Sequence, residues 1–311
     1  MTTKETALAQ FETIDFESIK DHPNILIAAN FWDEDRYQAA RVCYKLMRAV
    51  DDLVDNYKTE HPVIAASDKE ALIAEVNDWI GSIVDNSKVP AGDQAIVETF
   101  DRFKIPVWPM KAFARSMIYD IMNDGFPSLE VFLEYAKGAS VAPASIFVHL
   151  CGLTATDGEY KVPTFDVERA ATPCALFSYL VHIVRDYQKD TFDHLPYFAD
   201  NFLAKQGLSR SDIMAMAHGA PVSDGFRQLI RTYRLLAGEY RQQTTDMIRE
   251  VRPQLGSRYK LSLDIIFALY EMVYERIDPD RGVFSTEELN PTAPEIRQCV
   301  YETILCFSDE D

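Results

Sequence analysis

Two pairs of aspartates, each spaced four residues apart, occur in stretches of this chain that otherwise have the pattern of buried helix. The first pair is Asp51 and Asp55, and the second is Asp186 and Asp190. Residues four apart lie on one face of an α-helix, so each pair places two carboxylates side by side. Like charges on an apolar face repel each other and lose hydration. The pattern therefore predicts a helical fold in which two acidic faces hold a hard cation, with Mg²⁺ as the first candidate and Mn²⁺ as the alternative.

Helical periodicity dominates the rest of the chain, and alternating strand-like runs are scarce. No internal repeat or low-complexity linker is present, so we expect one all-α domain over residues 1–311, with 1–20 and 279–311 peripheral. The pattern predicts helices at about 36–57, 67–84, 92–103, 109–123, 128–137, 139–153, 166–190, 209 onward, 222–250, 256–277 and 292–306.

Composition limits the class of protein. The chain is 47% hydrophobic and carries a net charge of −18, which argues against nucleic-acid binding and against electrostatic adhesion to anionic lipid. Five cysteines without a CxxC pair are typical of small core residues in a reducing compartment. The amino terminus lacks a signal-peptide pattern and no apolar run is long enough to span a bilayer. We expect a cytoplasmic protein, with transient contact at a membrane surface left open and the oligomeric state undetermined.

Each acidic stretch also has a plainer interpretation. Tyr44, Arg48, Asp51 or Asp52, and Asp55 recur at helical spacing, and such a stripe alone could be a solvated face with an internal ion pair. The second stretch, with His182 ahead of its two aspartates, could be a buried polar network closed by Arg185. The presence of both pairs favours metal sites over these alternatives.

Two further residues are ambiguous when taken alone. His182 fits a hydrogen-bonded core histidine better than a magnesium ligand, because imidazole prefers softer metals. Lys137 lies in a stretch of small residues, 135–147, which indicates either close helix packing or room for a ligand. Lys137 itself is either a phosphate partner or a solvated lysine. No P-loop, dinucleotide-binding, HExxH or GxSxG motif is present.

Taken together, these motifs resemble those of the squalene/phytoene synthase family of head-to-head prenyltransferases. The resemblance covers roughly residues 25–275. It is carried by Tyr44-xxx-Arg48-xx-Asp51-Asp52-xx-Asp55, by Arg185-Asp186-xxx-Asp190 and by the stretch 195–209 that follows. Tyr119-Asp120 and Tyr135-Ala-Lys-Gly also fall where the family has comparable residues. The resemblance implies an isoprenoid-synthase-type helical bundle with a central apolar cavity and the two aspartate motifs facing each other at its mouth.

The resemblance also implies roles for individual residues. Magnesium would be held by Asp51, Asp52, Asp55, Asp186 and Asp190, with His182 a doubtful sixth ligand. The substrate diphosphate would contact Arg48, Arg185, Lys137 and Lys189. Tyr44 would contact the diphosphate or the motif carboxylates, and Tyr270 is matched loosely to a tyrosine near the reacting centre.

Several positions depart from the family pattern: Tyr179 replaces Gln, His182 replaces Asn and Lys189 replaces Glu. The usual basic residue after the second motif is Leu195 or Pro196 here, and the family's Gly-rich stretch is altered from Gly138 to Pro143. They indicate a divergent branch. The expected activity is Mg²⁺-dependent condensation of two allylic prenyl diphosphates to a squalene- or phytoene-like product, with the need for NADPH open. A terpene cyclase or a prenyltransferase acting on another acceptor is the first alternative. A non-catalytic relative serving as an assembly or interaction protein is the second.

Overall fold

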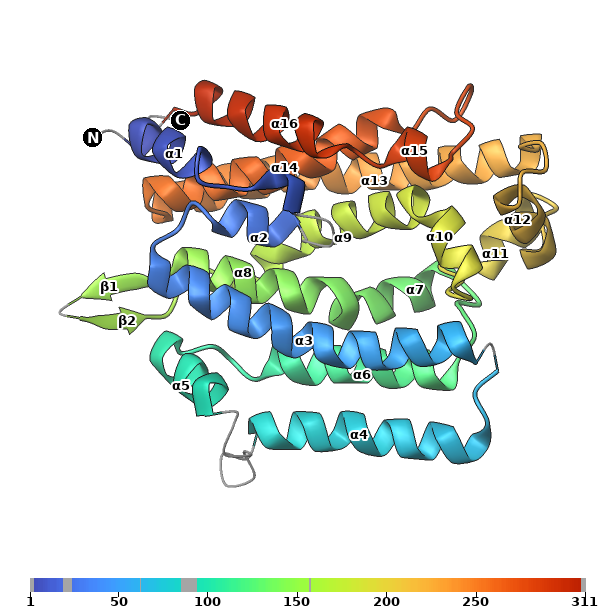
Figure 1. The fold of residues 1–311 in the computed structure, drawn as a ribbon, viewed down its shortest axis with the longest axis horizontal. Coiled ribbons are helices and arrows are strands. Elements are labelled where there is room, and N and C mark those ends of the chain that lie inside the picture. The colour runs from blue at the N-terminus through green and yellow to red at the C-terminus, as the bar shows by residue number, and fades with distance from the viewer. Residues whose placement is uncertain (1–2, 19–23, 62, 85–93, 157, 309–311) are drawn as a thin grey trace.

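The computed structural model describes residues 3–18, 24–61, 63–84, 94–156 and 158–308, which form a layered stack of helices (Figure 1). Short 3₁₀ and π segments carry the letter η. The elements are α1 (Thr3–Phe11), η1 (Phe16–Ser18), α2 (Asn24–Ala29), α3 (Glu34–Glu60), α4 (Ala66–Val84), α5 (Gln94–Phe103), α6 (Trp108–Met122), α7 (Leu129–Ala136), η3 (Lys137–Val141), α8 (Ala142–Gly152), β1 (Thr154–Thr156), β2 (Glu159–Lys161), α9 (Val167–Arg185), α10 (Tyr187–Phe192), α11 (Asp200–Lys205), α12 (Arg210–Ala217), α13 (Asp224–Val251), η4 (Arg252–Gln254), α14 (Ser257–Arg276), α15 (Thr286–Leu289) and α16 (Ala293–Cys306).

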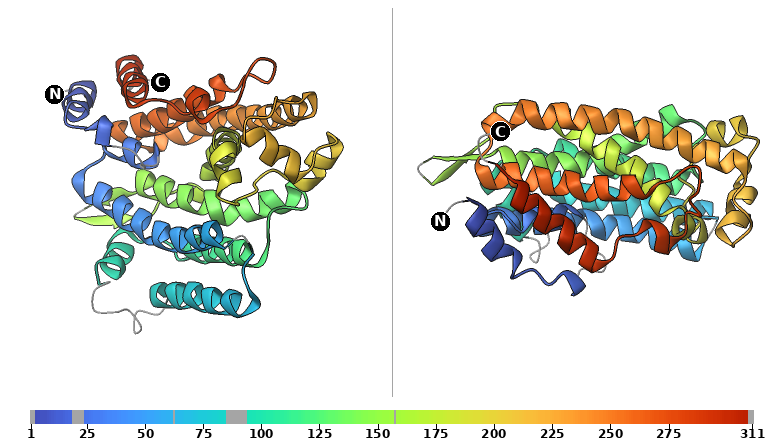
Figure 2. Two further views of the ribbon diagram at one scale, coloured as in Figure 1. Left: turned by 45° about the vertical axis from the view of Figure 1, so that its right-hand side comes forward. Right: turned by 90° about the horizontal axis from the view of Figure 1, so that it is seen from above.

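Helix α9 lies at the centre of the stack. It packs against α8, α13 and α14, while α3 packs against α6 and α8. Helix α4 forms one outer layer against α6, and α1 and α16 form the other against α14 (Figures 1 and 2). The predicted all-α class is confirmed, and both aspartate motifs are on helices that border the interior of this stack.

Capping residues fix where the two motif helices begin. Asp33 accepts a hydrogen bond from the backbone N–H of Arg36 at the start of α3, and Asp166 does the same for Arg169 at the start of α9. Such caps satisfy backbone donors that the first helical turn leaves without partners. Asp33 and Asp166 therefore fix where α3 and α9 begin. The motif aspartates lie toward the other end of each helix.

The predicted single helix at 166–190 is wrong in one respect, because the chain bends at Asp186. This residue has φ −97° and ψ 4°, and it separates α9 from α10. The Asp186 N–H still donates to the His182 carbonyl and the Asp190 N–H to the Asp186 carbonyl, each at 2.8 Å. Helical hydrogen bonding therefore continues across the bend, and only the direction of the axis changes inside the second motif.

Two other features did not follow from the helical pattern. Residues 137–141 form a π-helical turn at which Gly138 approaches α6 so closely that a Cβ atom would lie 2.1 Å from the Ala112 carbonyl oxygen. The close helix packing expected of the small-residue stretch is thus confirmed. Strands β1 and β2 form a short antiparallel hairpin between α8 and α9.

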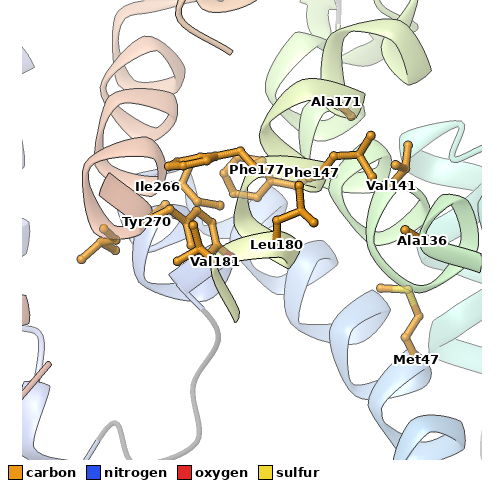
Figure 3. Close-up of a cluster of buried hydrophobic side chains, with 14 of the residues drawn as sticks. Met47, Ala136, Val141, Phe147, Ala171, Phe177, Leu180, Val181, Ile266 and Tyr270 are labelled. Atoms are coloured by element: carbon orange, nitrogen blue, oxygen red, sulfur yellow. The ribbon is translucent and has the colours of Figure 1, made fainter. Parts of the chain in front are cut away.

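The hydrophobic core surrounds α9. Figure 3 shows Met47 of α3, Phe147 of α8, Phe177 and Leu180 of α9, and Ile266 of α14 in one apolar cluster. All five side chains are buried. Among the helices of the described residues, none combines the length and the apolar character that a bilayer crossing requires.

Candidate active site

The first aspartate motif lies in the last third of α3. Arg48 donates to Asp51 at 2.8 Å and also pairs with Asp52, whose side chain is 44% exposed. In the part of the chain that the structure describes, no Arg or Lys forms an ion pair with Asp55. Burial, together with the neighbouring charges of Asp51 and Asp120, raises the pKa of Asp55 to about 8. The first motif therefore holds one arginine-neutralised side and one carboxylate that lacks a counterion.

The second motif has the same division. Arg185 contacts Asp186 with two nitrogens, at 2.8 and 2.5 Å, and although burial opposes it, this pairing lowers the pKa of Asp186 below its usual value. Asp190 has no ion-pair partner among the described residues. Burial and the nearby carboxylates of Asp186 and Asp55 raise the pKa of Asp190 well above its usual value, although Lys189 acts against them.

The two motifs lie near each other at Asp55 and Asp190, close enough for their charges to interact. Asp55 is among the charges that raise the pKa of Asp190, so two carboxylates from distant parts of the sequence share one partly buried region. Burial also raises the pKa of Asp51, and Asp52 adds to this while Arg48 opposes it. The structure thus brings the four motif aspartates to one region, and Asp55 and Asp190 form no ion pair with any of the residues it describes.

A tyrosine pair borders the space between the motifs. The rings of Tyr179 on α9 and Tyr197 in the α10–α11 connection meet edge to face, with centroids 6.1 Å apart. Burial raises the pKa of both hydroxyls well above the usual value, with Asp55 and Asp120 contributing in each case. The two phenols therefore stay neutral, and both lie near enough to Asp55 and Asp120 to feel their charges.

A buried network of hydrogen bonds and charges lies near the first motif, and its role was not predicted from the sequence. Tyr135 donates its hydroxyl proton to Asp120 at 2.6 Å, and the Lys58 ammonium lies 3.8 Å from the same carboxylate. Burial raises the pKa of Asp120 to about 6, against the pull of Lys58 and Tyr135. A lone carboxylate inside the apolar helix α6 and a lysine on the buried face of α3 were the signals that could have revealed this network.

A cavity of about 240 Å³ lies on the interior side of the motifs, and we call it the central cavity. Its wall comes from α2, α3, η3, α8, α9 and α14 and is mainly apolar. The small residues Ala139, Ser140 and Ala144 line it, so the stretch around Lys137 both packs closely and leaves room. The polar groups that reach it from the motif helices and α14 are Tyr44, Ser178, Tyr179, His182 and Tyr270.

His182 differs from the hydrogen-bonded core histidine that the sequence favoured. Its Nε2 atom is buried and has no hydrogen-bond partner among the described residues, and its ring meets that of Tyr270 edge to face at 5.2 Å. Burial and the nearby Arg185 lower the pKa of His182 to about 3, so the imidazole is neutral. Tyr270 itself lies on the cavity wall with its pKa raised by burial.

Of the predicted diphosphate contacts, Lys137 lies away from the motif carboxylates, and Lys189 lies beside the second motif with a largely exposed side chain. Lys137 pairs with Glu134 at 2.5 Å, its side chain is 61% exposed, and it lines a separate groove between α6 and α7 that contains none of the motif aspartates. Lys189 points to solvent and lies 3.7 Å from Asp193. Arg48 and Arg185, by contrast, lie within the motifs and already contact their carboxylates.

The donors at this site fit magnesium in one particular way. Among the described residues, no three His, Cys, Asp or Glu side chains cluster tightly enough to enclose a metal ion by themselves. Mg²⁺ usually keeps several waters and is held by one or two carboxylates together with substrate phosphates. Asp55 and Asp190, half-buried and without an ion-pair partner among the described residues, supply oxygen donors of that kind from two separate helices.

Comparisons with known proteins point to one family. The sequence pattern of the family described as Squalene/phytoene synthase matches residues 20–287. Phytoene synthase 2 of Solanum lycopersicum is 23% identical over 245 residues, which cover 78% of this chain and 73% of that protein. Phytoene synthase 1 of Arabidopsis thaliana is 24% identical over 198 residues, which cover 63% of this chain and 44% of that protein.

Solved structures share the fold. A dehydrosqualene synthase crystallised with a ligand superposes with a TM-score of 0.66 at 15% identity, covering 98% of this chain and 100% of that one. Squalene synthase HpnC from Alicyclobacillus acidocaldarius gives a TM-score of 0.63 at 15% identity, over 89% of this chain and 98% of its own. The predicted isoprenoid-synthase-type bundle is therefore confirmed.

Proposed function

The chain belongs to the squalene/phytoene synthase family, and we propose that it is a prenyltransferase that joins two allylic prenyl diphosphates head to head and releases diphosphate. The observation that carries the proposal is the pair Asp55 and Asp190, two carboxylates from separate helices that share a partly buried region without a counterion. Buried like charges of this kind are costly, and active sites are where proteins retain them.

The chain's own residues have distinct tasks in this proposal. Asp51, Asp55, Asp186 and Asp190 would hold Mg²⁺ or Mn²⁺, which would supply positive charge for the leaving diphosphate. Arg48 and Arg185 orient Asp51 and Asp186, because each arginine contacts the carboxylate of its own motif. Arg185 also favours the ionised form of Asp186, whereas Arg48 only opposes the rise that burial causes in the pKa of Asp51.

The central cavity supplies the environment for the hydrocarbon part of the substrate. Its apolar wall excludes water from the electron-deficient carbon that forms when the allylic C–O bond breaks. Tyr179 and Tyr270 add aromatic faces, which attract positive charge. Neutral phenols also suit this position, because the oxygen of a charged phenolate would form an irreversible bond to the carbocation.

A second candidate, a non-catalytic relative that acts as an assembly protein, is favoured by one observation. Arg48 and Arg185 already neutralise part of each motif, and Lys189 adds positive charge beside the second. Such a site could persist as an ion-pair network without a substrate. The two candidates differ in whether the protein binds and consumes a prenyl diphosphate.

The test is incubation with geranyl, farnesyl or geranylgeranyl diphosphate and Mg²⁺, with and without NADPH, followed by mass analysis of the extracted products. A hydrocarbon or diphosphate ester with twice the carbon number of the substrate supports head-to-head coupling. A product with the carbon number of one substrate indicates a cyclase. Absence of both turnover and diphosphate-dependent stabilisation indicates the non-catalytic alternative. The variant Asp190→Asn serves as the inactive control.

A further inference from the structure

His182 belongs to the wall of the central cavity, and the proposed function gives it no task. Its Nε2 atom is buried and has no hydrogen-bond partner among the described residues, and the ring meets that of Tyr270 edge to face at 5.2 Å. Buried polar atoms are nearly always paired, so an unpaired one indicates a further role for its side chain. The unpaired ring therefore points to a role toward a ligand of this cavity.

The ring lies where the apolar cavity meets the second aspartate motif. His182 precedes Asp186 by four residues, which is about one helical turn, and the charge of Asp186 acts on the imidazole. The cavity wall around it is mainly apolar and includes Met47 and Ile266. In the proposed function the reacting carbon lies at this same boundary, because it joins the diphosphate to the hydrocarbon.

Head-to-head coupling requires that protons leave the substrate. Each prenyl diphosphate loses its diphosphate together with the electron pair of the C–O bond, so the joined hydrocarbon has two positive charges to discharge in total. A neutral hydrocarbon results either from the loss of two protons or from the loss of one proton and the gain of one hydride. At least one proton must therefore pass to a base, and in a cavity that excludes water this base is a group of the protein or the released diphosphate.

We propose that the imidazole of His182 is the base that removes the final proton of the coupling reaction, so that the product is a hydrocarbon formed without a hydride donor. The assignment rests on the proposed function and adds to it a catalytic residue and a class of product. In this step the C–H bond next to the cationic carbon breaks and its electron pair becomes the second bond of a C=C. The proton forms an N–H bond with the ring nitrogen that carries none. It then passes to the diphosphate released at the motif, which returns the imidazole to its neutral form.

His182 is a stronger base than the hydroxyl groups that line the cavity with it. The imidazole is neutral, so one of its nitrogens offers a lone pair as an acceptor. The hydroxyl oxygens of Tyr44, Ser178, Tyr179 and Tyr270 accept a proton far less readily. A role as a magnesium ligand suits the ring less well, because Mg²⁺ prefers oxygen donors.

The experiment is incubation of the full chain with farnesyl or geranylgeranyl diphosphate and saturating Mg²⁺, without NADPH, followed by mass analysis of the coupled products. The wild type should give a hydrocarbon with two hydrogens fewer than two prenyl groups. His182→Phe keeps an aromatic ring against Tyr270 but has no nitrogen, so the hydrocarbon should fall at least about tenfold as a share of the coupled products. An alcohol, formed when water reaches the cation, should take its place.

The matched control is His149→Phe, which removes a buried imidazole that does not line the central cavity and that lies 2.9 Å from the Phe103 carbonyl oxygen. Its coupled products should have the wild-type composition. A second variant covers the case in which His182→Phe does not fold. His182→Ala leaves room for free imidazole, and added imidazole should restore the hydrocarbon in this variant while leaving the products of the wild type and of His149→Phe unchanged.

An unchanged hydrocarbon share in His182→Phe, or no response of His182→Ala to imidazole, overturns the assignment. A change confined to the Mg²⁺ concentration that gives half the maximal rate also overturns it, because a metal ligand would behave in this way. If the wild type needs NADPH for its coupled product, or releases it as an alcohol, the proposed coupling stands and the role of His182 falls. If the wild type makes no coupled product, the proposed function falls as well.

Discussion

The unneutralised carboxylate of Asp55 should make the metal-free protein less stable at high pH, and Asp55→Asn should remove this effect. The folded chain raises the pKa of Asp55 from an ordinary 3.8 to about 8. The folded state therefore keeps this proton to higher pH than the unfolded state does. The resulting stabilisation is complete below about pH 4 and is lost progressively as the pH rises to about 8.

The size of the effect follows from the shift. At about 1.4 kcal/mol for each pKa unit, a shift from 3.8 to about 8 sets an upper limit of about 6 kcal/mol. Asp55 is half-buried, and solvent screening reduces electrostatic energies there to a fraction of their fully buried values. We therefore expect Asp55→Asn to be about 2 kcal/mol more stable than the wild type at pH 9. For a chain of this length that corresponds to a rise of about 4 °C in the melting temperature.

The assay is thermal unfolding followed by circular dichroism between pH 4.5 and 9, in EDTA. The gap between Asp55→Asn and the wild type should grow with pH and level off above pH 8. Asp52→Asn is the control, because Asp52 is exposed and its pair with Arg48 is of the kind that contributes about 0–1 kcal/mol. A gap that does not depend on pH, or a loss of stability in Asp55→Asn at pH 9, refutes the reasoning.

Three further predictions follow from single contacts. Asp190→Asn should lower turnover at least about a thousandfold while the far-ultraviolet circular dichroism stays unchanged, because this residue serves the ligand rather than the packing; turnover near the wild-type value would contradict its assignment. Lys137→Ala should leave kcat/KM within about twofold, since its exposed side chain pairs with Glu134 in another groove; a loss beyond tenfold would place it at the substrate after all. Gly138→Ala should lower the free energy of unfolding in urea by about 3 kcal/mol, because its Cβ would overlap the Ala112 carbonyl. An unchanged free energy of unfolding would mean that the π turn relaxes freely.

The positions of most long helices could be predicted from local patterns in the sequence. Helical spacing located α3, α4, α6, α13, α14 and α16 to within a few residues, because their apolar stripes and caps are properties of short segments. The same spacing placed Asp51 beside Asp55 and Asp186 before Asp190. The family resemblance supplied the remaining step, that two distant motifs face each other. The charge interaction between Asp55 and Asp190 agrees with it.

Features that depend on long-range packing could not be predicted. The bend at Asp186 leaves the local hydrogen bonds intact, so nothing in the helical pattern marks it. The outward position of Lys137 depends on the π turn, which is set by how Gly138 packs on α6. The contact between Tyr179 and Tyr197 joins a helix to a connection whose path only the assembled stack determines.

The central claim is that both aspartate motifs form one site for cations and a diphosphate. The most direct measurement is the thermal stabilisation of the wild type, Asp55→Asn and Asp190→Asn by inorganic diphosphate, with and without Mg²⁺. We predict that the wild type is stabilised only when both are present, and that either substitution alone removes most of the shift. Stabilisation that survives in both variants, or that needs no Mg²⁺, would contradict a shared site.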